Sequence, residues 1–439
     1  MKKYTPVRAF FRWKSKNGWN TSTILATIVF VITVAGLIIY YRQGGIKDFG
    51  IRETGLRDVG VYIDGGTRIL NQTNPYIFGL RGGTFGSLVI AILFKWIPLS
   101  LSTIYFQILS FIGIAIFIKS TQIRFSIGKF LIILSSVYVF SSTRELLATN
   151  QIVAICMGFL GGGLILLKSK NIIVRIAGIA LVAVSVDLKP HLFGLFIVVL
   201  FLNSRKYRDL YILFLFLLLT HLLIDLSQRR LLEIDWIKMI SGFQGRAQNA
   251  GLGDSVTFWP ILSKILGISN YPGFVLLIPF ALLAVISFYL LHTKHANESI
   301  MVSLFAPAFL FYFHFYDAMP FLILVFIFTL KSQLYFQNII AVMFWNMSLL
   351  AKEINNSRNI VFLIVYLAIL LIAFYGFRNL QAFIVATIIT VMIRICLINW
   401  IDSSALLQSA VVTVNIVLGI IFILFLKSKT VPFREPKTL

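Results

Sequence analysis

Charged side chains are scarce in this chain. Only 13% of its residues are Asp, Glu, Lys or Arg, about half the share in soluble globular domains, and 59% are hydrophobic. This shortage excludes an ordinary soluble enzyme. Uncharged apolar stretches recur along nearly all of the 439 residues, and each approaches the roughly 20 residues that a helix needs to cross a membrane. The sequence therefore predicts an all-α polytopic membrane protein without a soluble domain.

Cysteines and acids are also few. Cys156 and Cys396, the two cysteines, lie within apolar runs, which argues against a disulfide framework or a thiolate metal site and predicts buried thiols. Lysine and arginine number 39 against 16 acids, for a net charge of +23. In a soluble protein this excess would suggest nucleic acid. In a membrane protein, the excess of basic residues is explained by their preference for cytoplasmic loops and by their attraction to anionic lipid headgroups. We therefore expect the lipid bilayer, and no nucleic acid, as a partner.

Fourteen apolar stretches are candidate membrane spans. The first follows six basic residues and lacks the short core and small-residue cleavage site of a signal peptide, so we expect a retained helix and a cytoplasmic N-terminus, residues 1–20. Two stretches, 190–203 and 318–330, are short enough to be pieces of broken spans, which gives about 12 to 14 helices. The stretches are 23–41, 100–118, 127–143, 152–167, 171–188, 190–203, 210–226, 270–293, 299–315, 318–330, 335–351, 359–377, 380–401 and 404–426.

Residues 84–98 set the orientation of all the spans that follow. If this apolar segment crossed the membrane, three loops with three basic residues each, at 119–129, 168–175 and 203–208, would face outward. That arrangement contradicts the positive-inside rule. We therefore predict a surface helix here.

With this topology the chain forms one domain, 1–439, in the plasma membrane. The first extracytoplasmic loop covers residues 42–99, a second long outer loop covers 227–258, and the tail 427–439 is cytoplasmic. Most of the acids then fall on or near the outer side, which suggests that the chemistry is external. The alternative is that acids merely fill the longer outer loops.

Within the first loop, residues 57–70 have a helical pattern. Apolar or small residues recur at positions 59, 62, 63, 66, 69 and 70, the spacing of one helical face. Asp58 falls at the start, where capping of free backbone N–H groups is the alternative to a catalytic role. Asp64 is predicted to solvate the helix or to pair with Arg68. A turn at Asn74-Pro75 ends the helix.

A set of short motifs follows one order along residues 20–330. They are Asp58-x3-Tyr62, Leu70-Asn71-Gln72-Thr73-Asn74-Pro75-Tyr76, the apolar segment ending at Pro98, Asn150-Gln151, Lys189-Pro190 and His314-Phe315-Tyr316-Asp317. This ordered set resembles glycosyltransferase family 87, membrane enzymes of the GT-C superfold that use polyprenyl-phosphate sugars. Two departures stand out: Phe85-Gly86-Ser87 replaces the family's Tyr-Pro-Pro, and Asn-Gln replaces its Gly-Gln.

The resemblance implies a GT-C-like bundle with interfacial helices in the first outer loop. It also implies transfer of a hexose, with mannose the expected sugar, from a polyprenyl-phosphate donor to an envelope glycolipid or glycan acceptor on the extracytoplasmic face. Asp58 would be the general base, and a single displacement would invert the anomeric carbon. No cofactor and no metal site are expected, although a divalent metal stays open.

The leaving phosphate needs cations, and the predicted outer surface offers several. Lys189 lies at an outer helix end, although pairing with Asp187 or extension to the interface is an equally weighted alternative. Arginine suits bidentate phosphate contacts. The further binding candidates are Arg52, Arg57, Arg144, Tyr62, Gln151, His314 and Asp317.

Two other classes of function stay open. A lipid-linked saccharide polymerase or ligase would centre on the arginines of the loop 227–258, which are Arg229, Arg230 and Arg246. A transporter or lipid flippase would place charges near the bilayer midplane. Arg394 is the clearest such charge, and most others lie at interfaces, which disfavours transport.

We predict that residues 84–98 do not cross the membrane. A cysteine introduced at Gln122 or Lys206 should then react with a membrane-impermeant maleimide only after the cells are permeabilised. Labelling of either position in intact cells would overturn both the topology and the location of the site.

Overall fold

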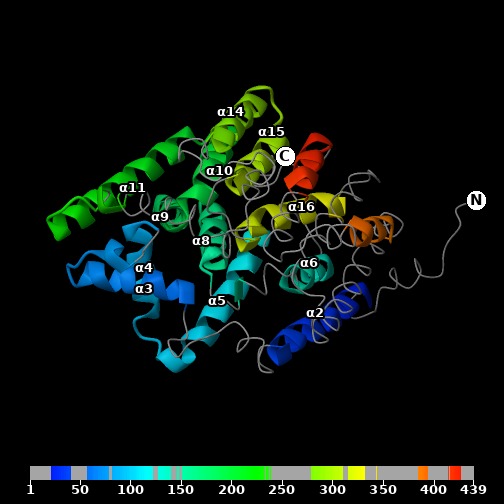
Figure 1. Cartoon of the computed structure of the whole chain (residues 1–439), viewed down its shortest axis with the longest axis horizontal. Coiled ribbons are helices and arrows are strands. Elements are labelled where there is room, and N and C mark those ends of the chain that lie inside the picture. Colours follow the sequence, from blue (N-terminus) through cyan, green and yellow to red (C-terminus); the bar gives the residue numbers. More distant parts are fainter. Residues whose placement is uncertain are drawn as a thin grey trace, which may run out of the picture.

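The computed structural model describes a large part of the chain, and its regular structure there is helical, without strands. Figure 1 shows the arrangement of these helices. The described residues are 21–40, 57–78, 82–121, 127–139, 146–147, 151–232, 234–236, 238, 278–309, 315–331, 343, 384–393, 414 and 416–426.

Most of the described helices follow the apolar stretches of the sequence. They are α2 (Thr21–Tyr40), α3 (Arg57–Leu70), α4 (Thr84–Phe94), α5 (Leu99–Ser120), α6 (Ile127–Val139), α8 (Val153–Leu166), α9 (Ile172–Leu188), α10 (Pro190–Asn203), α11 (Tyr207–Gln228), α14 (Ile278–His292), α15 (Ala296–Phe305) and α16 (Met319–Lys331). Three 3-10 helices join them: η3 (Pro75–Phe78), η5 (Ala306–Phe309) and η6 (Phe315–Ala318).

Two of the described helices, α11 and the segment Leu101–Ser120 of α5, are long and apolar enough to cross a membrane. Several shorter apolar helices accompany them. The architecture is thus compatible with an all-α membrane protein. The predicted spans 335–351 and 359–377 lie outside the described residues, apart from residue 343.

The predicted span 299–315 is not one continuous α-helix. The helix α15 ends at Phe305, and the 3-10 helix η5 follows it. Pro307 explains the break, because proline has no backbone N–H to donate to the carbonyl of Ser303, four residues earlier. Hydropathy does not register this loss, since proline interrupts the hydrogen bonds without adding charge.

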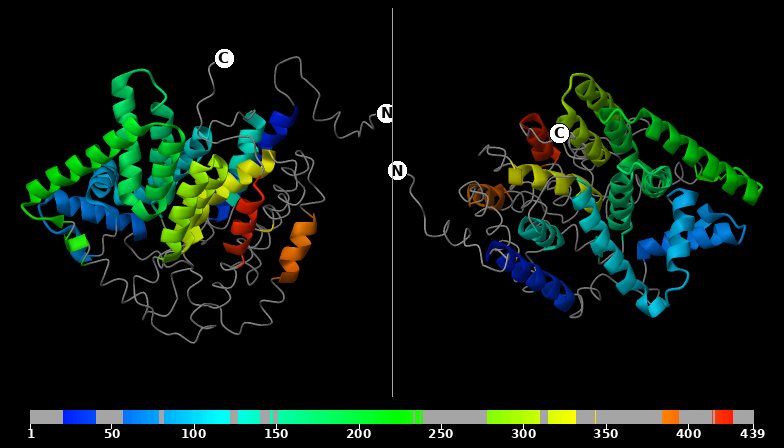
Figure 2. Two further views of the ribbon diagram at one scale, coloured as in Figure 1. Left: turned by 90° about the horizontal axis from the view of Figure 1, so that it is seen from above. Right: turned by 180° about the vertical axis from the view of Figure 1, so that it is seen from behind.

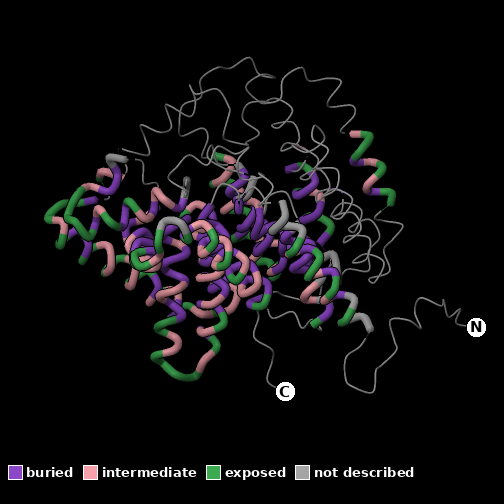
Figure 3. The backbone as a smooth tube through the Cα atoms, turned by 90° about the horizontal axis from the view of Figure 1, so that it is seen from below, coloured by how far each residue is buried: buried purple, intermediate pink, exposed green. Residues whose placement is uncertain are grey.

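The core forms around α8, which packs against α5 and α9 (Figures 1 and 2). Glycines allow these helices to approach closely: a Cβ added to Gly113 of α5 would lie 2.2 Å from the carbonyl oxygen of Ala154, and one added to Gly158 would lie 2.7 Å from the Cα of Gly113. Small residues at helix crossings are typical of membrane bundles. Figure 3 shows buried residues gathered in the middle of the described helices.

The predicted helix of the first loop is confirmed as α3, an amphipathic helix that packs on α4. Val59, Tyr62 and Ile69 of its apolar face are buried, whereas Leu70 is 51% exposed. A Cβ at Gly66 would lie 2.2 Å from the carbonyl oxygen of Ser87, so this glycine is the crossing point of the two helices. The 11 residues of α4 extend only about 16 Å, roughly half the hydrocarbon thickness.

The close crossing of α5 and α8 yields a prediction about stability. Gly113→Ala should lower the apparent melting temperature in detergent, because its Cβ would meet backbone and separate the helices, at a cost of about 1–3 kcal/mol. Gly194→Ala in α10 is the matched control, since nothing lies within 4 Å of its added Cβ. The control should keep or slightly raise the melting temperature, because alanine favours helix over glycine. Equal responses of the two variants would contradict the packing described here.

Candidate functional site

Lys189 and Asp317, two of the predicted site residues, form a buried ion pair. Lys189 Nζ lies 3.5 Å from Asp317 Oδ1, although the two residues are 128 positions apart. Lys189 joins the end of α9 to the start of α10, and Asp317 lies in η6. Their exposed fractions are 3% and 1%. The ammonium therefore does not extend to the surface, and each charge compensates the desolvation of the other.

Asp187, two residues before Lys189, holds the N-terminus of α4. Gly83 is the N-cap residue of α4 and has no side chain with which to cap it. The N–H of Gly86, the third helical residue, instead donates to Asp187 Oδ2 at 2.7 Å, which is the bond that a capping side chain normally accepts. The N–H of Gly83 donates to the Asp187 carbonyl at 2.8 Å. A residue of α9 thus caps α4 from outside, where a carboxylate also suits the helix dipole.

The same carboxylate contacts α11 through a histidine. His221 Nε2 lies 2.6 Å from Asp187 Oδ1, and His221 Nδ1 lies 3.4 Å from the hydroxyl of Thr84 at the start of α4. A carboxylate oxygen accepts hydrogen bonds, and His221 is the donor to Asp187 in the form that carries a proton on Nε2. Sequence reasoning did not select His221; the available signal was an ionisable side chain within the long and mostly apolar stretch 210–226, which marks a functional candidate in a membrane.

The first loop meets these residues through Tyr62. A Cβ added to Gly82 would lie 2.6 Å from Tyr62 Cε1 and 2.9 Å from the carbonyl oxygen of Leu188. Tyr62 is thus close to the chain segment that carries Asp187 and Lys189. Asp58 is the second residue of α3, one turn before Tyr62, so the helix begins two residues earlier than the capping prediction required. The side chain of Asp58 lies outside the description.

Asp64 has the structural role predicted for it. Its carboxylate accepts a hydrogen bond from Arg68 Nε at 2.8 Å, and both residues lie on the outer surface of α3. Four residues separate the two, the spacing at which opposite charges stabilise a helix.

The turn after α3 connects the two predicted outer loops. Asn74 Oδ1 accepts the N–H of Tyr76 at 2.9 Å, and Asn74 Nδ2 donates to Asp235 at 3.2 Å. Gln228, at the end of α11, donates to the carbonyl of Ile69 at 2.8 Å. The motif Asn74-Pro75-Tyr76 therefore attaches α3 to the segment that follows α11. Within this segment Arg230 also pairs with Asp235.

Gln151 is buried immediately before α8, and its N–H donates to Leu146 at 2.9 Å. Cys156, within the first turns of α8, is fully buried as predicted.

The remaining candidates cannot be placed beside the pair. Arg52, Arg144, His314 and Cys396 lie outside the described residues, as do the side chains of Arg57 and Tyr316. Among the described residues, no three His, Cys, Asp or Glu side chains form a group that could hold a metal ion.

No family model matches this chain, and no curated protein or solved structure matches it. The resemblance to family 87 therefore rests on the sequence motifs alone.

The buried pair yields a prediction that separates its charges from its packing. Lys189→Met leaves the Asp317 carboxylate buried without its ammonium, and Asp317→Leu does the converse, so each should destabilise the protein by about 3–5 kcal/mol. The double variant should recover much of this loss, because it buries neither charge. Thermal unfolding of the purified protein in detergent measures all three. If the double variant is the sum of the single ones, the two charges are not coupled.

Proposed function

We propose that this protein is a multi-pass glycosyltransferase with a GT-C-like bundle of about 12 to 14 spans. It transfers a hexose, with mannose the expected sugar, from a polyprenyl-phosphate donor to a lipid or glycan acceptor on the outer face of the plasma membrane. The buried contact between Lys189 and Asp317 carries the proposal. It joins two of the motifs on which the resemblance to family 87 rests, and chance alignment of apolar helices would not predict that contact.

The position of the first loop supports the same proposal. Asp187 caps α4, and Tyr62 of the Asp58-x3-Tyr62 motif lies near Leu188. A third motif therefore adjoins the segment that carries the ion pair. The departure from the family at Phe85-Gly86-Ser87 also has a physical reason, because Gly86 donates its N–H to Asp187 and a proline there would have none.

In the proposed reaction, Asp58 accepts the proton of the acceptor hydroxyl while that oxygen attacks the anomeric carbon. The bond from the anomeric carbon to the phosphate oxygen breaks, and polyprenyl phosphate leaves with the bonding electrons. Lys189 stabilises the charge that develops on the phosphate, and Asp317 fixes the position of the ammonium. Arg52, Arg57, Arg144, His314 and Gln151 supply further contacts to phosphate or acceptor.

A transporter is the second candidate, and the pair of His221 with Asp187 favours it. His221 lies two turns inside α11, at a depth where ionisable groups often carry protons or ions through membranes. The ligase alternative would rest on the arginines of the loop 227–258. Of these, Arg230 already pairs with Asp235, and Arg246 lies outside the described residues.

One assay separates transfer from transport. The purified protein in nanodiscs is offered a radiolabelled polyprenyl-phosphate hexose and crude envelope lipids, and thin-layer chromatography follows the label. The glycosyltransferase releases polyprenyl phosphate and moves the label to a larger glycolipid or glycan. An unchanged donor in this assay, together with passage of the donor across the membrane of proteoliposomes, would replace the proposal by the transporter.

Asp58→Asn tests the proposed base. Asparagine keeps the size of aspartate and caps helices about as well, yet it cannot take a proton, so transfer should fall by roughly 10²–10⁴-fold while folding stays normal. Asp64→Asn is the matched control on the same helix, because Asp64 is exposed and pairs with Arg68. It should retain turnover.

The panel is completed by Asp48→Asn and Glu53→Gln, the other acids of the first loop. If Asp58→Asn keeps near-normal turnover and one of the other three variants loses it, the base is that other residue. If all four variants stay active, the proposed mechanism is wrong.

A further inference from the structure

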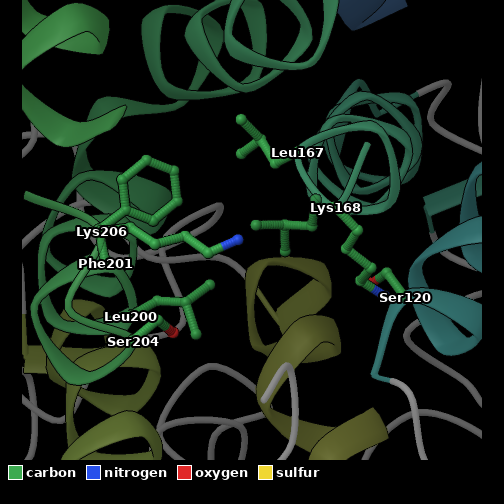
Figure 4. A pocket seen from close by; sticks show the side chains of 8 residues that line it. Ser120, Leu167, Lys168, Leu200, Phe201, Ser204 and Lys206 are labelled. Atoms are coloured by element: carbon green, nitrogen blue, oxygen red, sulfur yellow. The ribbon is translucent and has the colours of Figure 1, made fainter. Parts of the chain in front are cut away.

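Polar side chains lie between helices at both ends of α10. At its C-terminal end the Lys206 ammonium points into a small hollow enclosed by the ends of α5, α8 and α10, and Lys168 reaches Ser120 (Figure 4). The described side chains leave room there for about one water molecule, which is too little for a ligand. The N-terminal end of α10 differs, because the polar groups beside it hold distant parts of the chain together.

Three glycines at the start of α4 receive the C-terminal end of α9. A Cβ added to Gly83 would overlap the Asp187 carboxylate. Those added to Gly82 and Gly86 would lie 2.9 Å from the carbonyl oxygen and 2.5 Å from the Cγ of Leu188, respectively. The absence of side chains at all three positions lets α4 and α9 meet closely. This close approach brings the first loop beside the segment that carries the ion pair.

The Asp187 carboxylate lies between these glycines and His221. Its Oδ2 accepts the Gly86 N–H at 2.7 Å, and its Oδ1 lies 2.6 Å from His221 Nε2. The side chain of Asp187 is 6% exposed and that of His221 is 25% exposed. A buried carboxylate needs partners for its oxygens. His221 therefore fixes the orientation in which Asp187 caps α4.

The helix α11, which carries His221, also contacts the start of α4 directly. His221 Nδ1 lies 3.4 Å from the hydroxyl of Thr84, the first residue of α4. Phe216 of α11 packs edge to face on Phe85, with 5.6 Å between the ring centroids. A polar and an aromatic contact thus support the same turn of α4 that Asp187 caps.

We propose that His221 is a positioning residue for the glycosyl transfer proposed above, on which this inference rests. By holding Asp187 on the N-terminus of α4, His221 sets the place of the first loop, and with it Asp58, relative to Lys189. His221 itself gives up no proton in the reaction. Its effect on the rate comes from geometry, because a displacement of about 1 Å between reacting groups can cost roughly 10²-fold.

Two amide variants separate the two nitrogens of the imidazole. Glutamine carries its N–H donor where His221 Nε2 lies and keeps the bond to Asp187, whereas the shorter asparagine carries its donor near the place of Nδ1. His221→Asn should therefore lower kcat roughly 10- to 100-fold. The KM for the polyprenyl-phosphate hexose should change less than about threefold, because Lys189 and Asp317 stay in place.

His221→Gln should restore kcat to within about threefold of the unaltered protein, since the contact with Asp187 is kept. Initial rates over a range of donor concentrations, measured on the purified protein in nanodiscs, give kcat and KM for each variant. Thr220→Val is the matched control on the same helix. The Thr220 hydroxyl donates to the carbonyls of Phe216 and Leu217 within α11, so this variant should keep both constants.

Hydrogen exchange measures the position of α4 without any transfer. Asp187 accepts the Gly86 N–H, so this amide should exchange roughly tenfold faster in His221→Asn than in His221→Gln. Mass spectrometry of the peptide that covers residues 83–90 reports the change. Exchange within α8 should be equal in the two variants, which shows that the bundle remains folded.

The outcomes separate this inference from the proposed function. Equal kcat and equal exchange in the two amide variants would overturn the positioning role. Equal loss of kcat in both, with normal exchange in His221→Gln, would show that the imidazole itself takes part in the reaction, and it would overturn the inference as well. If the unaltered protein transfers no sugar, the proposed function fails, and the exchange of the Gly86 amide still decides whether His221 holds α4.

Discussion

The position of the first loop depends on one carboxylate. Asp187 accepts the Gly86 N–H and contacts His221, so it joins α4, α9 and α11. Without it, the N-terminus of α4 would bury a backbone donor that has no partner, because the N-cap residue is a glycine. Since α3 packs on α4 at Gly66, the distance from Asp58 and Tyr62 to the Lys189 segment follows from this same contact. The capping of α4 is therefore also what brings the first loop to the candidate site.

Charge pairing governs the buried polar groups at both ends of α9. Asp187 with His221 and Lys189 with Asp317 lie at its C-terminal end, and Arg175 with Asp209 lies near its N-terminal end. Buried pairs contribute little stability compared with apolar side chains of the same size. These pairs are therefore better explained as mutual compensation of charges that the fold buries than as a source of stability.

The sequence alone predicted those features that depend on residues close together in the chain. Long apolar runs predicted most described helices, and Asp64 pairs with Arg68 because the partner lies one turn away. The contacts that build the site are not local: Asp187 and His221 are 34 residues apart, and Lys189 and Asp317 are 128 apart. No periodicity identifies such partners. Leu70, predicted on the packed face, is exposed because α3 ends there and Gln72 turns the chain at φ 55°. Pro307 likewise interrupts the α-helix within a stretch that hydropathy alone treats as continuous.

The proximity of Asp317 to Lys189 bears on how the proposed transfer would be completed. The donor carries a phosphodiester with about one negative charge, whereas the released lipid phosphate carries roughly −1.5 to −2 near neutral pH. A lone buried ammonium would hold the product more tightly than the donor and would delay its release. A carboxylate 3.5 Å from that ammonium opposes the accumulated charge on the product while fixing the lysine in place. Transition-state stabilisation requires a cation that is already in place where charge develops. Turnover also requires that this cation not hold the released lipid phosphate too tightly. The buried pair meets both requirements, which is why Asp317 belongs to the proposed site although it would repel the phosphate itself.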